Sequence, residues 1–183
     1  MLTTDYSTDY KAVLLKQDRQ IFSIDDLAIL WQIVNRNTLR TTIKRYLVNQ
    51  TLFSIRRGLY SVVPLKKLDP KLLGTSYISG FCYVSLQTVL AQEGLINQQP
   101  RAITLIGSRS QTFTVAGNDF ICKKMKSLFL HNLEGISLDE EYPQATPARA
   151  VADMWYYNSR FYLDHAQKHL INQAKAIHKK VYK

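Results

Sequence analysis

The chain has 183 residues, of which 46% are hydrophobic, and a formal net charge of +10 at pH 7. This composition excludes wholesale disorder, because a chain with so many apolar residues can bury a core. Its length allows one large domain or two small ones. The excess of positive charge favours a polyanionic partner, with nucleic acid expected before a membrane surface.

The sequence predicts a cytoplasmic protein without a membrane segment. Nowhere does an apolar run approach the roughly 20 residues of a membrane-spanning helix. The first ten residues are polar and acidic, unlike a secretory signal. Cys82 and Cys122 lie far apart among apolar or aromatic neighbours and have no metal-ligand spacing. We expect them to be buried free thiols in a reducing compartment.

The N-terminal region is patterned as short helices. Residues 11–19 are amphipathic and predict a first helix. Ser23 precedes Asp26 by three positions, ahead of an apolar run, and this variant of the capping box predicts a second helix that begins at Ile24. Asn35 or Asn37 would cap a third helix that reaches about residue 49. The residues expected on its buried face are Leu39, Ile43, Tyr46 and Leu47.

Basic residues gather in two places just after this point. The stretch from Leu27 to Leu68 contains no acidic residue, and its basic residues fall in two clusters, one on the predicted third helix and one at the tip of a predicted hairpin. The turn, Arg56-Arg57-Gly58, separates β-patterned runs at 52–55 and 59–63, and Gly58 can adopt the positive φ that a tight hairpin needs. The basic residues of this stretch are Arg36, Arg40, Lys44, Arg45, Arg56, Arg57, Lys66 and Lys67.

Three helices followed by a hairpin predict a winged helix-turn-helix domain over residues 1–66. In that arrangement the third helix enters the DNA major groove and the hairpin reaches the flanking backbone. A stretch without acidic residues suits this use, because neutralisation of phosphates supplies most non-specific affinity. The alternative is that the basic stripe is an ordinary solvated helix face and that the arginines at the turn are simply exposed.

Residues 67–183 are expected to form a small mixed α/β domain with a C-terminal helix, which makes the whole chain α+β. Residues 66–79 are mixed and turn-rich, and we expect a linker there. The predicted elements beyond it are a helix from Ser85 to Glu93 stopped by Gly94, strands at 103–106 and 112–115, one or two strands within 120–130, an acidic loop at 139–141, a helix opened by Thr146-Pro147, and a helix over 163–181 with a basic tail.

Three segments of the sequence, taken in order, resemble the AbiEi-type antitoxins of bacterial type IV toxin–antitoxin systems. They are Arg57-Gly58-Leu59-Tyr60, Tyr83-Val84-Ser85-Leu86 with Ala91 and Gly94-Leu95, and Ala145-Thr146-Pro147-Ala148-Arg149-Ala150 with Ala152-Asp153. The resemblance spans about residues 21–157. It implies an N-terminal winged helix that binds operator DNA and represses the antitoxin–toxin operon. It also implies a C-terminal α/β domain and a functional link to a nucleotidyltransferase-like toxin, without need of a stable complex.

Position within this motif assigns DNA contact to the third helix and the turn. The predicted DNA-binding residues are Arg36, Asn37, Arg40, Thr41, Lys44, Arg45, Arg56 and Arg57. Arginine can fork onto guanine or clamp a phosphate, and the sequence leaves open which arginine does which.

Other candidate chemistries are weaker. Residues 107–110 (Gly-Ser-Arg-Ser) lack the spacing and the Lys-Ser/Thr ending of a phosphate-binding P-loop, so a polar connection is expected. His165 and His169 are placed i, i+4 on the predicted last helix without a third ligand. Asp153 is expected to pair with Arg149 at i, i+4. We therefore expect no catalytic residues, no metal, no cofactor and no enzymatic activity.

The main hypothesis is a DNA-binding antitoxin and autorepressor that acts on double-stranded operator DNA as a monomer or dimer. A stand-alone winged-helix regulator without a toxin is the second. A nucleic-acid-processing enzyme that uses the C-terminal domain is the third. In the fourth, the basic faces meet an acidic protein partner.

Overall fold

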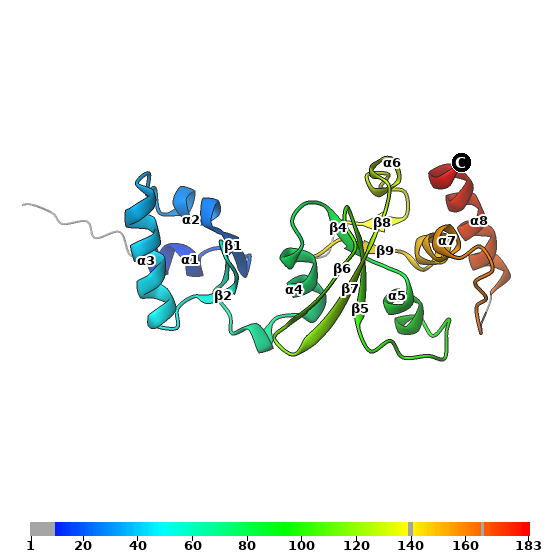
Figure 1. The fold of residues 1–183 in the computed structure, drawn as a ribbon, viewed down its shortest axis with the longest axis horizontal. Helices are drawn as coiled ribbons and strands as arrows, with labels where there is room; N and C mark the ends of the chain where they lie inside the picture. Colours follow the sequence, from blue (N-terminus) through cyan, green and yellow to red (C-terminus); the bar gives the residue numbers. More distant parts are fainter. Residues whose placement is uncertain (1–9, 139–140, 166) are drawn as a thin grey trace, which may run out of the picture. The chain divides into compact units, whose positions relative to one another are not determined.

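The computed structural model describes residues 10–138, 141–165 and 167–183. The chain divides into two compact units, the first ending at Leu68 and the second running from Asp69 to Lys183 (Figure 1). The protein is a mixed α+β chain with helices near its N-terminus and a helix at its C-terminus. Among the described residues, no helix is both long enough and apolar enough to cross a membrane.

The first unit combines helices with a small antiparallel sheet. Its strands follow the order β1-β3-β2, and Phe22 of β1 lies opposite Tyr60 of β3. Beneath the sheet and helices lies one apolar core that includes Leu14, Trp31 and Leu39. The elements are α1 (Tyr10–Leu15), β1 (Ile21–Ser23), α2 (Ile24–Leu30), α3 (Arg36–Val48), β2 (Phe53–Arg56), β3 (Leu59–Ser61) and a 3-10 turn, η1 (Leu65–Lys67).

Local capping explains where α2 and α3 begin. The Ser23 hydroxyl accepts from the Asp26 N–H at 3.1 Å, and the Asp26 carboxylate accepts from the Ser23 N–H at 2.7 Å. The predicted capping box and the start at Ile24 are thus confirmed. Asn35 caps α3 by accepting from the backbone N–H groups of the second and third residues that follow it. The predicted buried face is also confirmed, because Leu39 and Ile43 are buried while Tyr46 and Leu47 pack against the core.

The first unit differs from the predictions at two boundaries and by one additional strand. The first helix ends at Leu15 instead of reaching residue 19, because Arg19 leaves the helix to donate to the Ile21 carbonyl at 2.9 Å and to pair with Asp26. The second hairpin strand ends at Ser61, whose hydroxyl accepts from the Val63 N–H and closes a local turn before Pro64. The sequence reading also missed β1, which pairs with β3.

The second unit is built on a six-stranded mixed sheet in the order β6-β7-β5-β4-β9-β8. The pairs β5–β7 and β4–β9 are parallel, and the remaining pairs are antiparallel. The elements are α4 (Pro70–Tyr77), β4 (Cys82–Val84), α5 (Gln87–Gln92), β5 (Ile103–Gly107), β6 (Gln111–Val115), β7 (Asn118–Lys124), α6 (Ser127–Leu130), β8 (Ile136–Ser137), β9 (Gln144–Ala145), α7 (Pro147–Tyr157) and α8 (Lys168–Tyr182).

Helices cover both faces of this sheet. In Figure 1, α4 lies on one side of the strands and α5 and α7 lie on the other, with α8 packed on α7. Neighbouring residues of β4 show the same division, because side chains alternate along a strand. The Cys82 thiol donates to the Thr75 carbonyl of α4, whereas the Tyr83 hydroxyl meets Arg149 of α7.

The predicted linker over residues 66–79 is wrong, because α4 occupies most of it. Asp69 caps this helix through the N–H groups of Lys71 and Leu72, and Pro70 suits its first position. Gly74 lies where α4 meets the sheet. A Cβ atom at that position would come within 2.3 Å of the Phe120 ring. This glycine marks a close approach of helix and strand.

Other boundaries in the second unit also moved. The helix predicted from Ser85 begins at Gln87, and it stops before Gly94 (φ +66°), as expected. The strand β4, which precedes this helix, was not predicted. The segment 120–130 holds the end of β7 and the helix α6. The last helix begins at Lys168 instead of residue 163, while the Thr146 cap and Pro147 start of α7 are confirmed. In the expected acidic loop, residues 139 and 140 lie outside the described part of the chain.

Both cysteines are buried and free, as predicted. Burial, with Cys122 nearby, raises the pKa of the Cys82 thiol to about 12. Burial alone raises the pKa of Cys122 to about 11. Both side chains therefore stay protonated near neutral pH and act as packing groups.

Candidate nucleic-acid interface

The helix α3 separates its residues cleanly between core and solvent. Leu39, Thr42 and Ile43 are buried. The opposite side of the helix is exposed along its length, and the six predicted contact residues on this helix all belong to it. They are Arg36, Asn37, Arg40, Thr41, Lys44 and Arg45. The fold therefore leaves the predicted basic face open and uses none of these side chains to build the core.

The N-terminal half of α3 offers both polar and basic side chains. The cap uses the Asn35 side chain and the Asn37 backbone N–H, at 2.9 Å, while the Asn37 side chain remains exposed. Thr41 lies one turn further along and is also exposed. Amide, hydroxyl and guanidinium groups are the side chains that read base edges in the major groove. A recognition helix makes such contacts mainly from its N-terminal residues.

One member of the basic face is already paired. The Arg36 guanidinium lies 2.8 Å from the Asp25 carboxylate of α2, and both side chains are more than half exposed. Asp25 precedes the acid-free stretch in sequence, so only the packing of α2 beside α3 brings it here. An exposed ion pair of this kind contributes little free energy. The pair shifts the centre of positive charge on α3 toward Arg40, Lys44 and Arg45.

The predicted tight turn is confirmed between β2 and β3. Gly58 has a φ of +79°, a conformation that L side chains rarely adopt. Its carbonyl accepts from the Ile24 N–H at 2.9 Å, which fastens the turn to the start of α2. Arg57 is exposed at the tip. Arg56 is half-buried and donates to the Arg57 carbonyl at 3.4 Å, so the turn presents Arg57 more fully than Arg56.

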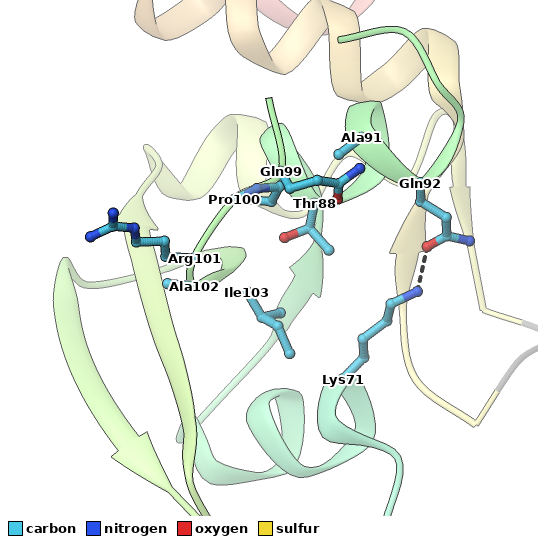
Figure 2. A pocket seen from close by; sticks show the side chains of 9 residues that line it. All are labelled: Lys71, Thr88, Ala91, Gln92, Gln99, Pro100, Arg101, Ala102 and Ile103. Atoms are coloured by element: carbon cyan, nitrogen blue, oxygen red, sulfur yellow. Dashed lines mark hydrogen bonds between the residues drawn. The ribbon is translucent and has the colours of Figure 1, made fainter. Parts of the chain in front are cut away.

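A pocket of about 240 Å³ lies in the second unit, between α4, α5 and the start of β5 (Figure 2). Three of its polar side chains, those of Lys71, Thr88 and Gln92, have hydrogen-bond partners. The Lys71 ammonium donates to the side chains of Gln92 and Gln144, and the Thr88 hydroxyl accepts from the Thr104 N–H at 2.7 Å. The Arg101 side chain extends away from Lys71 (Figure 2). The pocket thus offers no convergent set of charged groups for a ligand.

Arg149 of α7 lies fully buried at the centre of a polar cluster in the second unit. Its guanidinium meets the Asp153 carboxylate at 2.7 Å, which confirms the predicted i, i+4 pair. It also donates to the Glu134 carbonyl at 2.7 Å and to the Tyr83 hydroxyl at 3.1 Å. The sequence reading missed these further partners, because they come from positions distant in the chain.

The cluster around Arg149 also satisfies Asp153. The Ser85 hydroxyl donates to one carboxylate oxygen at 2.6 Å, and the Tyr182 hydroxyl of α8 donates to the other. Although burial opposes it, Asp153 holds the pKa of Arg149 above its ordinary value. Burial, reinforced by Asp153, raises the pKa of Tyr83 and Tyr182. The ion pair of Arg149 and Asp153 is shielded from solvent, and its hydrogen bonds join α7 to α8 and to the sheet. In this arrangement the pair holds these elements together.

The structure corrects the placement of the histidine pair. His165 precedes α8, where it hydrogen bonds to the Asn97 side chain at 3.0 Å, while His169 lies inside the helix. Within the described ranges there is no cluster of three or more histidine, cysteine or acidic residues placed to hold a metal ion.

Comparison with known proteins finds no protein-family model that matches this chain and no significant relative among curated proteins.

Proposed function

We propose that this protein is a cytoplasmic DNA-binding antitoxin that represses its own operon, with its first unit acting as a winged helix-turn-helix. In this proposal α3 enters the major groove of double-stranded DNA and the Arg57 turn contacts the flanking backbone. The observation that carries it is the exposed, basic, polar face of α3. That face presents six of the eight predicted contact residues on one helix.

The surrounding fold supports this proposal. Three helices precede a hairpin, and β1 joins the hairpin to give a three-stranded antiparallel sheet, an arrangement typical of winged helices. The hydrogen bond from the Ile24 N–H to the Gly58 carbonyl ties the turn to the helical part of the unit. A turn held in this way can keep Arg57 in place at low entropic cost when it meets a phosphate.

The antitoxin part of the proposal rests on the resemblance of the sequence to AbiEi-type antitoxins. In that reading the second unit acts against a nucleotidyltransferase-like toxin or arranges two copies on a palindromic operator. The gene that follows should encode such a toxin, and co-expression of this protein should restore growth to cells that express it. If the protein binds its operator but does not rescue growth, it is a stand-alone regulator of the same fold.

The test of DNA binding compares the protein's own upstream DNA with a scrambled duplex of the same length across a salt series. We expect the specific complex to be tighter by on the order of a thousandfold at matched salt. Equal and steeply salt-dependent binding to both duplexes would mean that the basic face binds the phosphate backbone without sequence specificity. Absence of binding at low salt would refute the proposal.

A further inference from the structure

Two parallel strands of the second unit end side by side. Gly107, the last residue of β5, is the register partner of Lys124, the last residue of β7. Hydrogen bonds hold the segments that follow against each other. The Lys124 N–H donates to the Ser110 hydroxyl at 3.1 Å, and the Met125 N–H donates to the Gly107 carbonyl at 2.9 Å. The loop that carries Arg109 therefore lies beside the segment that carries Lys126.

Basic side chains concentrate at this end of the strands. Arg109, Lys124 and Lys126 are exposed, and Lys123 is half-buried. The sequence has no acidic residue between Glu93 and Glu134 except Asp119. That carboxylate lies near the opposite end of β7, where it accepts from the Thr114 hydroxyl at 2.6 Å. Like charges this close repel one another, and a polyanion relieves the repulsion.

Aromatic rings accompany these lysines. The Lys123 ammonium lies 5.3 Å from the centre of the Tyr157 ring, and the Lys126 ammonium lies 6.0 Å from that of Phe129. Tyr156 connects the two rings, with ring centroids 5.0 Å from Tyr157 and 5.6 Å from Phe129. The Tyr157 hydroxyl donates to the Lys124 carbonyl at 2.8 Å and fixes α7 against the end of β7. All three rings are half-buried, so each keeps part of its surface in solvent.

We infer that this surface of the second unit, formed by Arg109, Lys123, Lys126, Phe129 and Tyr157, binds single-stranded nucleic acid. Lysines alone would suit any polyanion, but half-exposed rings among lysines suit a strand with unstacked bases. An exposed cation–π contact contributes about 0.5–1 kcal/mol, whereas a base stacked on an aromatic ring contributes about 1–3 kcal/mol. A base can therefore replace a lysine over its ring, and the freed ammonium can take the neighbouring phosphate. A duplex hides the base faces and gains nothing from the rings.

The charge test uses fluorescence anisotropy of a labelled oligouridylate of about 12 nucleotides with the full chain, a length within the range of single-strand sites. The double variant Lys123→Gln/Lys126→Gln should weaken binding on the order of tenfold near 0.1 M salt. It should also reduce the slope of log affinity against log salt by about 1.4, roughly 0.7 for each lost phosphate contact.

The double variant Arg101→Gln/Lys168→Gln is the matched control, because it removes the same charge elsewhere on the second unit. Arg101 precedes β5, and Lys168 begins α8, whereas the proposed surface lies at the far end of β5 and near the end of α8. Control and wild type should bind alike. Equal weakening by both double variants would mean that only net charge matters, which would overturn the inference.

The stacking test changes Tyr157. Tyr157→Leu should weaken binding about tenfold, with the salt slope unchanged. Tyr157→Phe keeps the ring but loses the hydrogen bond to the Lys124 carbonyl, so it should bind like wild type. Equal loss in both variants would assign Tyr157 to folding alone and contradict the stacking role.

This inference is independent of the proposed function of the first unit. Arg40→Ala/Lys44→Ala should weaken operator duplex binding and leave oligouridylate binding intact. Binding of the single strand without any duplex binding would refute the proposed function and support this inference. Absence of oligouridylate binding at low salt would refute the inference. So would a weakening of duplex binding alone by Lys123→Gln/Lys126→Gln, which would make the surface an extension of the duplex interface.

Discussion

On α3 of the first unit, arginine side chains stand in solvent on an open helix face, whereas on α7 of the second unit Arg149 is wholly enclosed. The two ion pairs on these helices have almost the same length. Arg36 lies 2.8 Å from Asp25, and Arg149 lies 2.7 Å from Asp153. What differs is the solvent: the first pair is exposed and the second has no contact with water.

The difference teaches that burial, more than distance, decides what an arginine does. An exposed pair is screened and exchanges readily with water, so its arginine stays available to a partner. A buried pair must be complete, because removing one member leaves an uncompensated charge in a medium that solvates it poorly. Arg149 is therefore committed to the fold, while Arg40, Lys44 and Arg45 remain available for binding.

The largest expected effect comes from breaking the buried pair. Asp153→Ala should destabilise the second unit by about 3–5 kcal/mol, because it leaves the Arg149 guanidinium buried without its carboxylate. Chemical denaturation followed by circular dichroism measures this change. Lys180→Ala, which removes the exposed pair with Glu134 at 2.6 Å, is the control and should change stability by less than about 1 kcal/mol. Similar losses in both variants would contradict the contrast between buried and exposed pairs.

The second-largest effect is expected from the loss of one proposed base contact on the exposed face of α3. Arg40→Ala should weaken binding to the operator duplex by about 1–3 kcal/mol if the guanidinium forks onto a guanine. Its thermal unfolding should match that of wild type, because the side chain is exposed. Lys16→Ala removes one exposed charge of the first unit outside α3 and serves as the control. Unchanged affinity at matched salt would remove Arg40 from the interface.

A smaller effect is expected at the half-buried capping box that Ser23 and Asp26 form at the start of α2. Ser23→Ala should cost about 1 kcal/mol, because it removes the side-chain cap of the helix. Ser23→Thr keeps a capping hydroxyl without adding a negative charge beside Asp26, so it is the conservative control and should retain most of the stability. Denaturant titration of wild type, Ser23→Ala and Ser23→Thr at neutral pH measures the difference.

The same capping box predicts that the stability of the first unit depends on pH. Although burial opposes it, hydrogen bonds from Ser23 and Arg19 hold the pKa of Asp26 below its ordinary value. The folded-state pKa lies below the unfolded one, so this stabilisation is complete above the unfolded pKa, about 4. It is lost as the pH falls through the folded-state pKa. Ser23→Ala should therefore lose less stability than wild type between neutral and acid pH. An equal loss in both proteins would exclude the capping box as a source of the pH dependence.

The smallest effect is expected at the exposed pair beside α3. Asp25→Asn should change stability by less than about 0.5 kcal/mol, and it should tighten duplex binding about twofold by freeing Arg36. Asp18→Asn removes the same charge from another exposed position of the first unit. Tighter binding in Asp25→Asn than in Asp18→Asn would show that the pair restrains Arg36. Equal affinities would show that only net charge changed.

The sequence was most informative where structure depends on neighbours in the chain. The Ser23 capping box, the turn at Gly58 and the Thr146 start of α7 were predicted at their observed positions, and Asn35 was one of the two residues predicted to cap α3. In each case the residues that make the hydrogen bond or adopt the required φ lie within a few positions of one another. The predicted Arg149–Asp153 pair was right for the same reason, since one helical turn brings the two side chains together.

The errors came where partners lie far apart in sequence. Residues 66–79 resembled a linker, because Pro70 and Gly74 are frequent in turns. Only the sheet shows that Pro70 starts α4 and that Gly74 makes room for Phe120. The strands β1 and β4 are three residues long, too short for a periodic signal, and they are defined by their pairing with β3 and β5.

The sequence by itself determined the helix caps, the tight turn and the basic character of α3, because these depend on local geometry and composition. Only the tertiary structure decided which charges stay in solvent. It placed Asp25 against Arg36, enclosed Arg149 with groups from Tyr83, Glu134 and Tyr182, and gathered Arg109, Lys126 and Tyr157 at the end of two parallel strands. The physical reason is that desolvation and charge proximity depend on distance in space, and the separation of residues along the chain does not fix that distance.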